Sequence, residues 1–236
     1  MVNKIKSGTL TKIIPIVLIF AASIIAQQIE VNKVSGDVKY QASTSEVWTE
    51  VKKGETLQMG GFISTGKNSS VQLNHSGSVV TIGELSAVSI SSIKKMTTDE
   101  LLLALAMEDM INAPNSNGKG NSGSTAVYGE DESKNKITEL GVNDFGVKRL
   151  NGAMQLADNS LMESSVIFAR ETYRKYPGTK KIASYRIFFA DILFDKGLYT
   201  EALGEYLEIQ KLELNNEQKG KIDSSINSIN KILLNN

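Results

Sequence analysis

The chain has 236 residues, which is long enough for one large domain or two small ones. Its 26 basic and 26 acidic side chains balance, and without the first 26 residues, which hold only lysines among charged side chains, 23 basic face 26 acidic ones. A chain so balanced has no electrostatic footprint for nucleic acid. The absence of cysteine excludes disulfides, thiolate nucleophiles and thiolate metal sites.

The N-terminus has the pattern of a secretory signal peptide. Lys4, Lys6 and Lys12 precede the apolar run IIPIVLIFAASIIA, which covers residues 13–26. Fourteen helical residues span about 21 Å, short of the roughly 30 Å hydrocarbon core of a bilayer. The pattern predicts a Sec signal peptide over residues 1–26, cleaved after Ala26, and a periplasmic or secreted location. An uncleaved membrane anchor remains the alternative.

Residues 27–96 have the pattern of a small all-β unit. Apolar residues alternate with polar ones, as in Val71-Gln72-Leu73-Asn74, and glycine-containing turns recur about every ten residues. Strands this short favour a sandwich or roll over a parallel sheet.

The same segment resembles the FecR-like domain, the extracytoplasmic module of the ferric-citrate regulator family. The resemblance covers about residues 31–93, and Gly61 departs from it because the family commonly has an aspartate there. Members that regulate sigma factors carry a cytoplasmic helical region, which this pattern lacks, so the resemblance implies a fold and a compartment. It is carried by Gly36, Val38, Trp48, Val51, Gly54, Leu57, Gly60, Ile63, Thr65, Gly66, Ser69, Val71, Leu73, Gly77, Ser78 and Val80.

No motif in the β segment predicts a catalytic, cofactor or metal site. Residues 61–67 fit the start of a phosphate-binding loop, but Asn68 stands where Ser or Thr would hold magnesium, and a strand pattern follows instead of a helix. The single histidine, His75, lies beside Ser76-Gly77 and is interpreted as a solvated turn residue. The single tryptophan, Trp48, is interpreted as a core or edge-packing residue, or as an exposed residue that stacks on a sugar ring or a partner.

A helix is predicted over residues 97–112 and a flexible linker over residues 113–133. Thr97 and Glu100 have the spacing of a capping box, and the linker segment is rich in asparagine, serine and glycine. The helix is expected to pack through one apolar face formed by Leu101, Leu102, Leu105 and Met110.

Residues 134–236 change to helical spacing and contain an internal repeat. Ala169 and Ala202 are 33 residues apart, as are Tyr173 and Tyr206, and a period near 34 is typical of helix-turn-helix solenoids. The region resembles the tetratricopeptide repeat (TPR) over about residues 143–214, and residues 219–234 would form a capping helix. The resemblance is carried by Tyr176, Pro177, Ala183, Tyr185, Ala190, Phe194, Gly197, Tyr199, Ala202, Leu203 and Tyr206, with Ser164 in the place of Gly197 in the first unit.

The predicted fold class is therefore α+β with two domains, a FecR-like β sandwich or roll followed by a TPR-like α-helical solenoid. Arg149, Arg170, Arg174 and Arg186 could line a groove that favours acidic peptides, or could belong to a solvated helix face.

These patterns predict a non-enzymatic binding or scaffold protein, since no nucleophile–base or carboxylate constellation emerges. We expect its partner to be an envelope protein or a cell-wall polymer, with self-association through the helical repeats as a further possibility. The alternative is an envelope signalling component related to FecR-type regulators that lacks the cytoplasmic anti-sigma region. An enzyme is the least favoured class.

Overall fold

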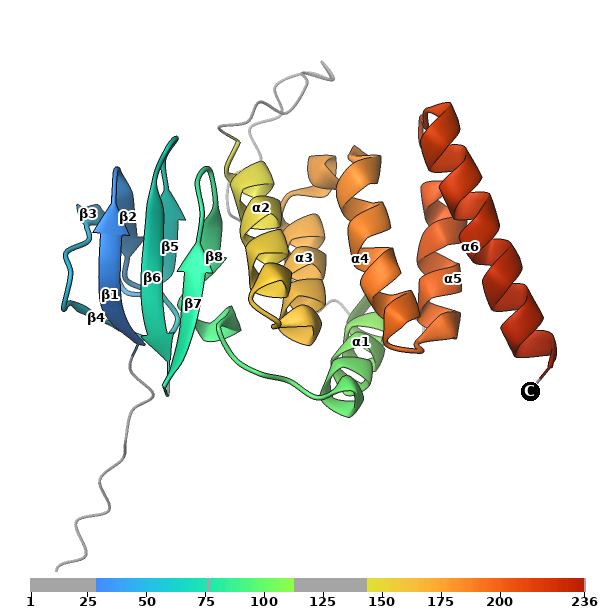
Figure 1. Ribbon diagram of the computed structural model, residues 1–236, viewed down its shortest axis with the longest axis horizontal. Helices are drawn as coiled ribbons and strands as arrows, with labels where there is room; N and C mark the ends of the chain where they lie inside the picture. The colour runs from blue at the N-terminus through green and yellow to red at the C-terminus, as the bar shows by residue number, and fades with distance from the viewer. Residues whose placement is uncertain (1–28, 76, 113–143, 236) are drawn as a thin grey trace, which may run out of the picture.

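The computed structural model describes residues 29–75, 77–112 and 144–235. The expected signal peptide (residues 1–26) and linker (residues 113–133) lie outside these ranges. In the described part, the strands lie at one end of the molecule and α6 lies at the other (Figure 1). The strands are β1 (Ile29–Ser35), β2 (Val38–Gln41), β3 (Trp48–Glu50), β4 (Thr56–Leu57), β5 (Phe62–Thr65), β6 (Ser70–His75), β7 (Ser78–Ile82) and β8 (Ala87–Ser89).

These strands form two four-stranded antiparallel sheets, with the orders β4-β1-β6-β7 and β3-β2-β5-β8. The alternation predicted for residues 71–74 is present in β6, where Val71 and Leu73 are buried and pair with Ile82 and Val80 of β7. Buried residues of both sheets and of the helices belong to one apolar cluster. The core therefore continues from the sheets into the helical part.

Two glycines of this region are required by close contacts. Gly36 has φ +75°, and an added Cβ would lie 2.4 Å from Ser69 Oγ, which accepts a hydrogen bond from the Asp37 amide at 2.8 Å. At Gly61 an added Cβ would lie 2.5 Å from the Tyr40 ring. It would also lie 2.7 Å from the Gln41 carbonyl oxygen, so no larger residue fits at this position unless the backbone moves.

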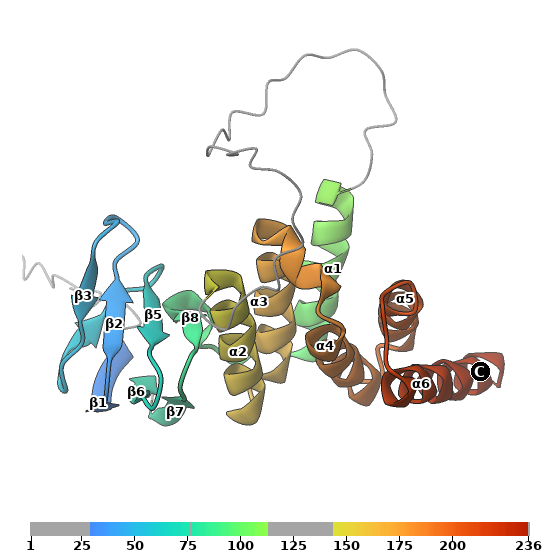
Figure 2. The same ribbon diagram turned by 90° about the horizontal axis from the view of Figure 1, so that it is seen from above.

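The helical part contains two successive helix pairs and a final long helix. The α2–α3 and α4–α5 pairs follow one another along the molecule, and α1 packs beside α3 (Figures 1 and 2). The described helices are α1 (Thr98–Asn112), α2 (Phe145–Asp158), α3 (Met162–Lys175), α4 (Ala183–Asp195), α5 (Tyr199–Ile209) and α6 (Asn216–Leu234), with short 3₁₀ turns η1 (Ile90–Ser92) and η2 (Pro177–Lys181).

The spacing of these pairs differs from the sequence repeat. From the start of α3 at residue 162 to the start of α5 at residue 199 is 37 residues, whereas the repeated alanines and tyrosines are 33 apart. Gly197 has a left-handed backbone conformation just before α5. The residue with that conformation before α3 is Ser160, whereas Ser164 lies inside α3. The difference is about one helical turn, so Tyr173 and Tyr206 still return to the same buried side.

Helix α1 has the predicted capping box but not the predicted single face. The Glu100 amide donates to Thr97 Oγ1 at 3.2 Å, and Glu100 Oε2 accepts from the Thr97 amide at 2.7 Å. Leu101 is buried, but Leu102 is 41% and Met110 is 74% exposed. The prediction was wrong for these two because each residue advances about 100° around a helix. Met110 is thus almost opposite Leu101.

Polar side chains on α2 and on its C-cap residue, Asn159, join the helical part to the β part. The side chain of Asn159 accepts from the Thr81 amide at 2.9 Å and donates to the Thr81 carbonyl at 2.8 Å, so it pairs with β7 at the edge of its sheet. Gln155 Oε1 accepts from the Gly83 amide, and Asn151 Nδ2 donates to the Leu85 carbonyl. Each bond goes to the main chain of residues 81–85.

Between these polar residues α2 approaches the sheet very closely. An added Cβ at Gly152 would lie 2.1 Å from the carbonyl oxygen of Ala87 in β8. Because no side chain fits in that space, the helix lies directly on the strand.

Candidate functional site

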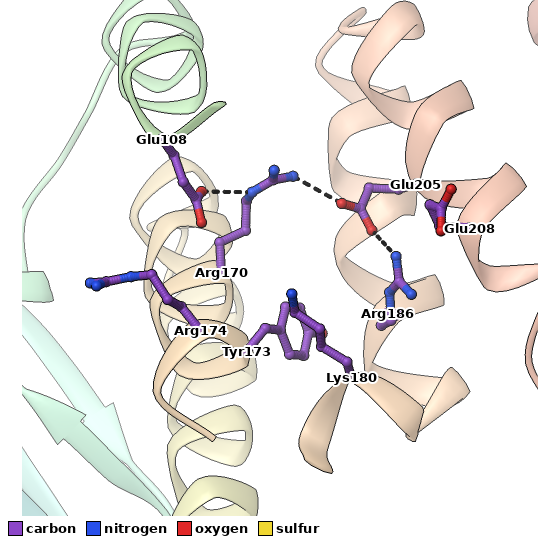
Figure 3. Close-up of a pocket in the computed structure, with 8 residues that line it drawn as sticks. All are labelled: Glu108, Arg170, Tyr173, Arg174, Lys180, Arg186, Glu205 and Glu208. Atoms are coloured by element: carbon purple, nitrogen blue, oxygen red, sulfur yellow. Dashed lines mark hydrogen bonds and ion pairs between the residues drawn. The ribbon is translucent and has the colours of Figure 1, made fainter. Parts of the chain in front are cut away.

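A cavity of about 460 Å³ lies among the helices, and several side chains expected at a groove line it. We call it the helix cavity (Figure 3). Its lining comes from α1, α3, η2, α4 and α5, segments that are far apart in the sequence. The lining residues are Glu108, Arg170, Tyr173, Arg174, Lys180, Arg186, Glu205 and Glu208.

An ion-pair chain ties four helices together around the helix cavity. Arg170 Nε lies 2.8 Å from Glu108 of α1, and Arg170 Nη1 lies 2.9 Å from Glu205 of α5. The second oxygen of Glu205 lies 2.7 Å from Arg186 Nη2 on α4. All four side chains are at most 23% exposed, so solvent screens these pairs less than pairs on an open surface.

Two further cations at the cavity have no acidic partner in the part of the chain that the structure describes. Arg174 and Lys180 are exposed, and within the described ranges neither makes an ion pair or a side-chain hydrogen bond. Glu208 is already paired with Lys211. The ion-pair chain is internally balanced, so Arg174 and Lys180 leave a local excess of positive charge.

Tyr173 lies on the cavity wall, and the guanidinium of Arg174 points away from it (Figure 3). The side chain of Tyr173 is 8% exposed, and its buried hydroxyl has no hydrogen-bond partner among the described residues. Burial, followed by the negative charge of Glu205, raises the pKa of Tyr173 above its ordinary value. The hydroxyl therefore stays protonated at neutral pH.

The exposed side chains of the cavity wall include an arginine and a lysine. Such side chains can bind a carboxylate or a similar anion. In the described part of the chain, no group of three or more His, Asp or Glu side chains lies close enough to hold a metal ion.

Arg170, Arg174 and Arg186 come together as expected, but Arg149 does not line the cavity. Arg149 is 1% exposed and lies on the other side of α3, where its guanidinium stacks over the rings of Phe62 at 4.8 Å and Phe168 at 4.4 Å. Burial lowers the pKa of Arg149, and the nearby charge of Glu171 opposes this effect. The expectation for Arg149 is therefore corrected, because aromatic residues from the sheet and from α3 enclose it.

Trp48 is half-buried at the junction between the sheets and the helices. Its ring meets Phe145, the first residue of α2, edge to face with 5.8 Å between centroids. It is therefore an edge-packing residue and contacts the helical part of the same chain.

His75 differs from its interpretation as a solvated turn residue. It ends β6, is half-buried, and its Nδ1 atom is buried without a hydrogen-bond partner in the described part. A second cavity of about 280 Å³ lies beside it, close to Lys94 and Lys95.

Lys180 and Tyr173 are not predicted as site residues. No motif singles out Lys180, and the sequence signal at Tyr173 is its place in the 33-residue repeat. Glu108 is separated from α3 by the segment 113–143, so the ion pair between Glu108 and Arg170 could be found only in three dimensions.

Comparison with known proteins gives little further information. No protein-family model and no curated protein matches the chain. A solved structure described as "Cell surface anchoring domain" is similar at 26% identity, over 27% of this chain and 84% of that chain, with a TM-score of 0.26. Among the described helices, none is long and apolar enough to cross a membrane.

Proposed function

We propose that this protein is an exported, non-enzymatic binding or scaffold protein whose helix cavity receives an acidic segment of an envelope protein. The observation that carries the proposal is the pair Arg174 and Lys180, two exposed cations at a 460 Å³ cavity that have no acidic partner among the described residues. An exposed excess charge beside a concave surface favours a ligand of opposite sign. The ion-pair chain through Arg170 holds the walls in place before the ligand arrives.

The family resemblances enter as part of this proposal. The predicted FecR-like fold is supported by Gly36 and Ser69, which belong to the resemblance and lie in contact with each other. The TPR-like reading is supported by two successive helix pairs followed by α6, although their spacing is longer than that of the sequence repeat. The location in the periplasm or outside the cell rests on the pattern of residues 1–26.

A peptide titration tests the charge preference of the helix cavity. A fluorescently labelled hexaglutamate peptide should bind the full chain at least tenfold more tightly than hexaglutamine. The double variant Arg174→Glu/Lys180→Glu should lose this preference, because two cations become anions at the cavity. The matched control is Lys219→Glu/Lys231→Glu, which makes the same change in net charge on exposed residues of α6.

Equal loss in both double variants would show that only net charge matters, and the cavity proposal would fail. If the cavity proposal holds, a photo-crosslinker placed at position 180 in cells should capture one defined envelope protein, whereas a crosslinker at position 219 should not. Co-sedimentation with purified cell-wall polymer that depends on Arg174 and Lys180 would instead assign the site to a polysaccharide. Loss of a transcriptional response on gene deletion would favour the signalling alternative.

A further inference from the structure

Helix α1 is apolar on both of its long sides. Its inner side carries Leu101 and Leu105, which are buried against the rest of the molecule. Its other side carries four large apolar side chains that are open to solvent, and we call these four the outer face of α1. They are Leu102 (41% exposed), Leu103 (62%), Met107 (55%) and Met110 (74%).

This concentration is unusual for a free surface. Eleven large apolar side chains are exposed among the described residues, and four of them lie on this one helix. A helix that is apolar all round is normally buried on all sides, and a contiguous exposed apolar patch commonly marks an interaction site. The outer face therefore calls for a covering partner.

We propose that the outer face of α1 is a docking surface for an amphipathic helix of another protein, with lysine or arginine beside its apolar stripe. Leu103, Met107 and Met110 follow the i, i+4, i+7 spacing of one helix face. Such a row matches a partner helix that presents the same spacing. The two methionines suit this use because their unbranched side chains adapt to the shape of a partner.

The charge of α1 selects the partner. The helix contains two aspartates and two glutamates and no lysine or arginine. Glu108 is paired with Arg170, and Glu100 Oε2 accepts from the Thr97 amide in the capping box. The exposed Asp99, in the first turn, can meet a basic residue of the partner, and the charge of Glu100 adds to the negative potential there. A second copy of the chain would bring one acidic helix against another, and an anionic bilayer would repel the same charges.

This surface is separate from the proposed acidic-segment site, and its test is independent of it. The probe is a labelled 18-residue synthetic peptide of leucine and lysine with its leucines on one helical face; a comparison peptide replaces each lysine by glutamate. By fluorescence anisotropy with the full chain, the leucine–lysine peptide should bind at least tenfold more tightly than the comparison peptide. Arg174→Glu/Lys180→Glu should leave this binding unchanged.

The deciding variant is Leu103→Asp/Met107→Asp. It should weaken binding of the leucine–lysine peptide at least tenfold, although it adds two negative charges that would strengthen a purely electrostatic attraction. The control is Leu207→Asp/Leu233→Asp, which changes two exposed leucines of α5 and α6 and should not weaken binding. Both variants should keep the thermal unfolding midpoint of the wild-type chain, because the changed side chains are exposed.

Three results would overturn the proposal. The first is unchanged or stronger peptide binding by Leu103→Asp/Met107→Asp. The second is a wild-type dimer in sedimentation velocity that this variant dissociates, which would assign the outer face to a second copy. The third is flotation of the wild-type chain with phosphatidylcholine–phosphatidylglycerol vesicles that the variant abolishes, which would assign the face to lipid.

Discussion

Arg149 contributes to the stability of the junction between the sheets and the helices through its volume and through its charge, and substitutions can separate the two effects. Its guanidinium stacks over Phe62 and Phe168, and Nε donates to Thr172 Oγ1 at 3.1 Å. Its Nη2 atom lies 3.5 Å from Glu171 but makes no hydrogen bond. The side chain thus fills space in the core and also brings a charge there that is only partly compensated.

Arg149→Met keeps most of the volume and removes the charge. The lost stacking amounts to about 2 kcal/mol per desolvated ring, and a hydrogen bond from a charged donor adds about 1.5–3 kcal/mol. Removal of a buried charge returns several kcal/mol of desolvation free energy, so similar replacements are often neutral or stabilising. We expect the free energy of unfolding to change by less than about 1.5 kcal/mol, because these contributions nearly cancel.

Arg149→Ala removes the same contacts and also leaves a cavity. Truncation of a large buried side chain typically costs about 2–5 kcal/mol, and Glu171 is not stranded because it is 32% exposed and also pairs with Lys175. A loss of about 4 kcal/mol would lower the melting temperature by roughly 10 °C in a chain of this size. Arg174→Met is the control, since Arg174 is exposed.

Urea unfolding measures these differences, with two signals recorded on the same samples. Fluorescence of Trp48, the only tryptophan, reports the junction because its ring contacts Phe145. Helix circular dichroism reports the helices. If Arg149→Met destabilises the chain as much as Arg149→Ala, the polar contacts of the guanidinium outweigh its volume and the reasoning is refuted.

Three further changes test the junction and the cavity. Gly152→Ala should cost about 3 kcal/mol in urea unfolding, because overpacking against the β8 carbonyl forces the elements apart, whereas Gly204→Ala, with open space, should be neutral or stabilising. Asn159→Ala should cost about 2 kcal/mol and speed hydrogen exchange at Thr81; unchanged exchange would argue against the edge pairing. Burial raises the pKa of Tyr173, so its contribution to stability is complete below pH of about 10 and falls above it. Tyr173→Phe should flatten that alkaline decline, and an identical pH profile would contradict the assignment.

The sequence was informative wherever local chemistry decides the structure. The alternation at Val71 and Leu73 specified a strand, and the spacing of Thr97 and Glu100 specified a helix start. The order of strands before helices followed from the change in apolar period. These features depend on neighbours within a few residues, which a single sequence displays.

Features that depend on distant segments could not be predicted. Arg149 shares a helix face with the buried Ala153 and Leu156, but a charged side chain is normally exposed, and only the rings of Phe62 and Phe168 explain its burial. The helix cavity unites Glu108 with Arg170 across a long stretch of chain. No periodicity encodes such contacts. Arg170, Arg174 and Arg186 line one cavity, whereas Arg149 is buried elsewhere.

The bonds from α2 to residues 81–85 have a consequence for how this protein can vary. Asn159, Gln155 and Asn151 bind backbone carbonyls, which every residue type offers, and backbone amides, which every residue type except proline offers. These bonds therefore place little constraint on the side chains of Thr81 and Leu85, while the helix side must keep its amide-bearing residues and Gly152. In related chains, we therefore expect more substitutions at Thr81 and Leu85 than at the helix residues Asn151, Gly152, Gln155 and Asn159.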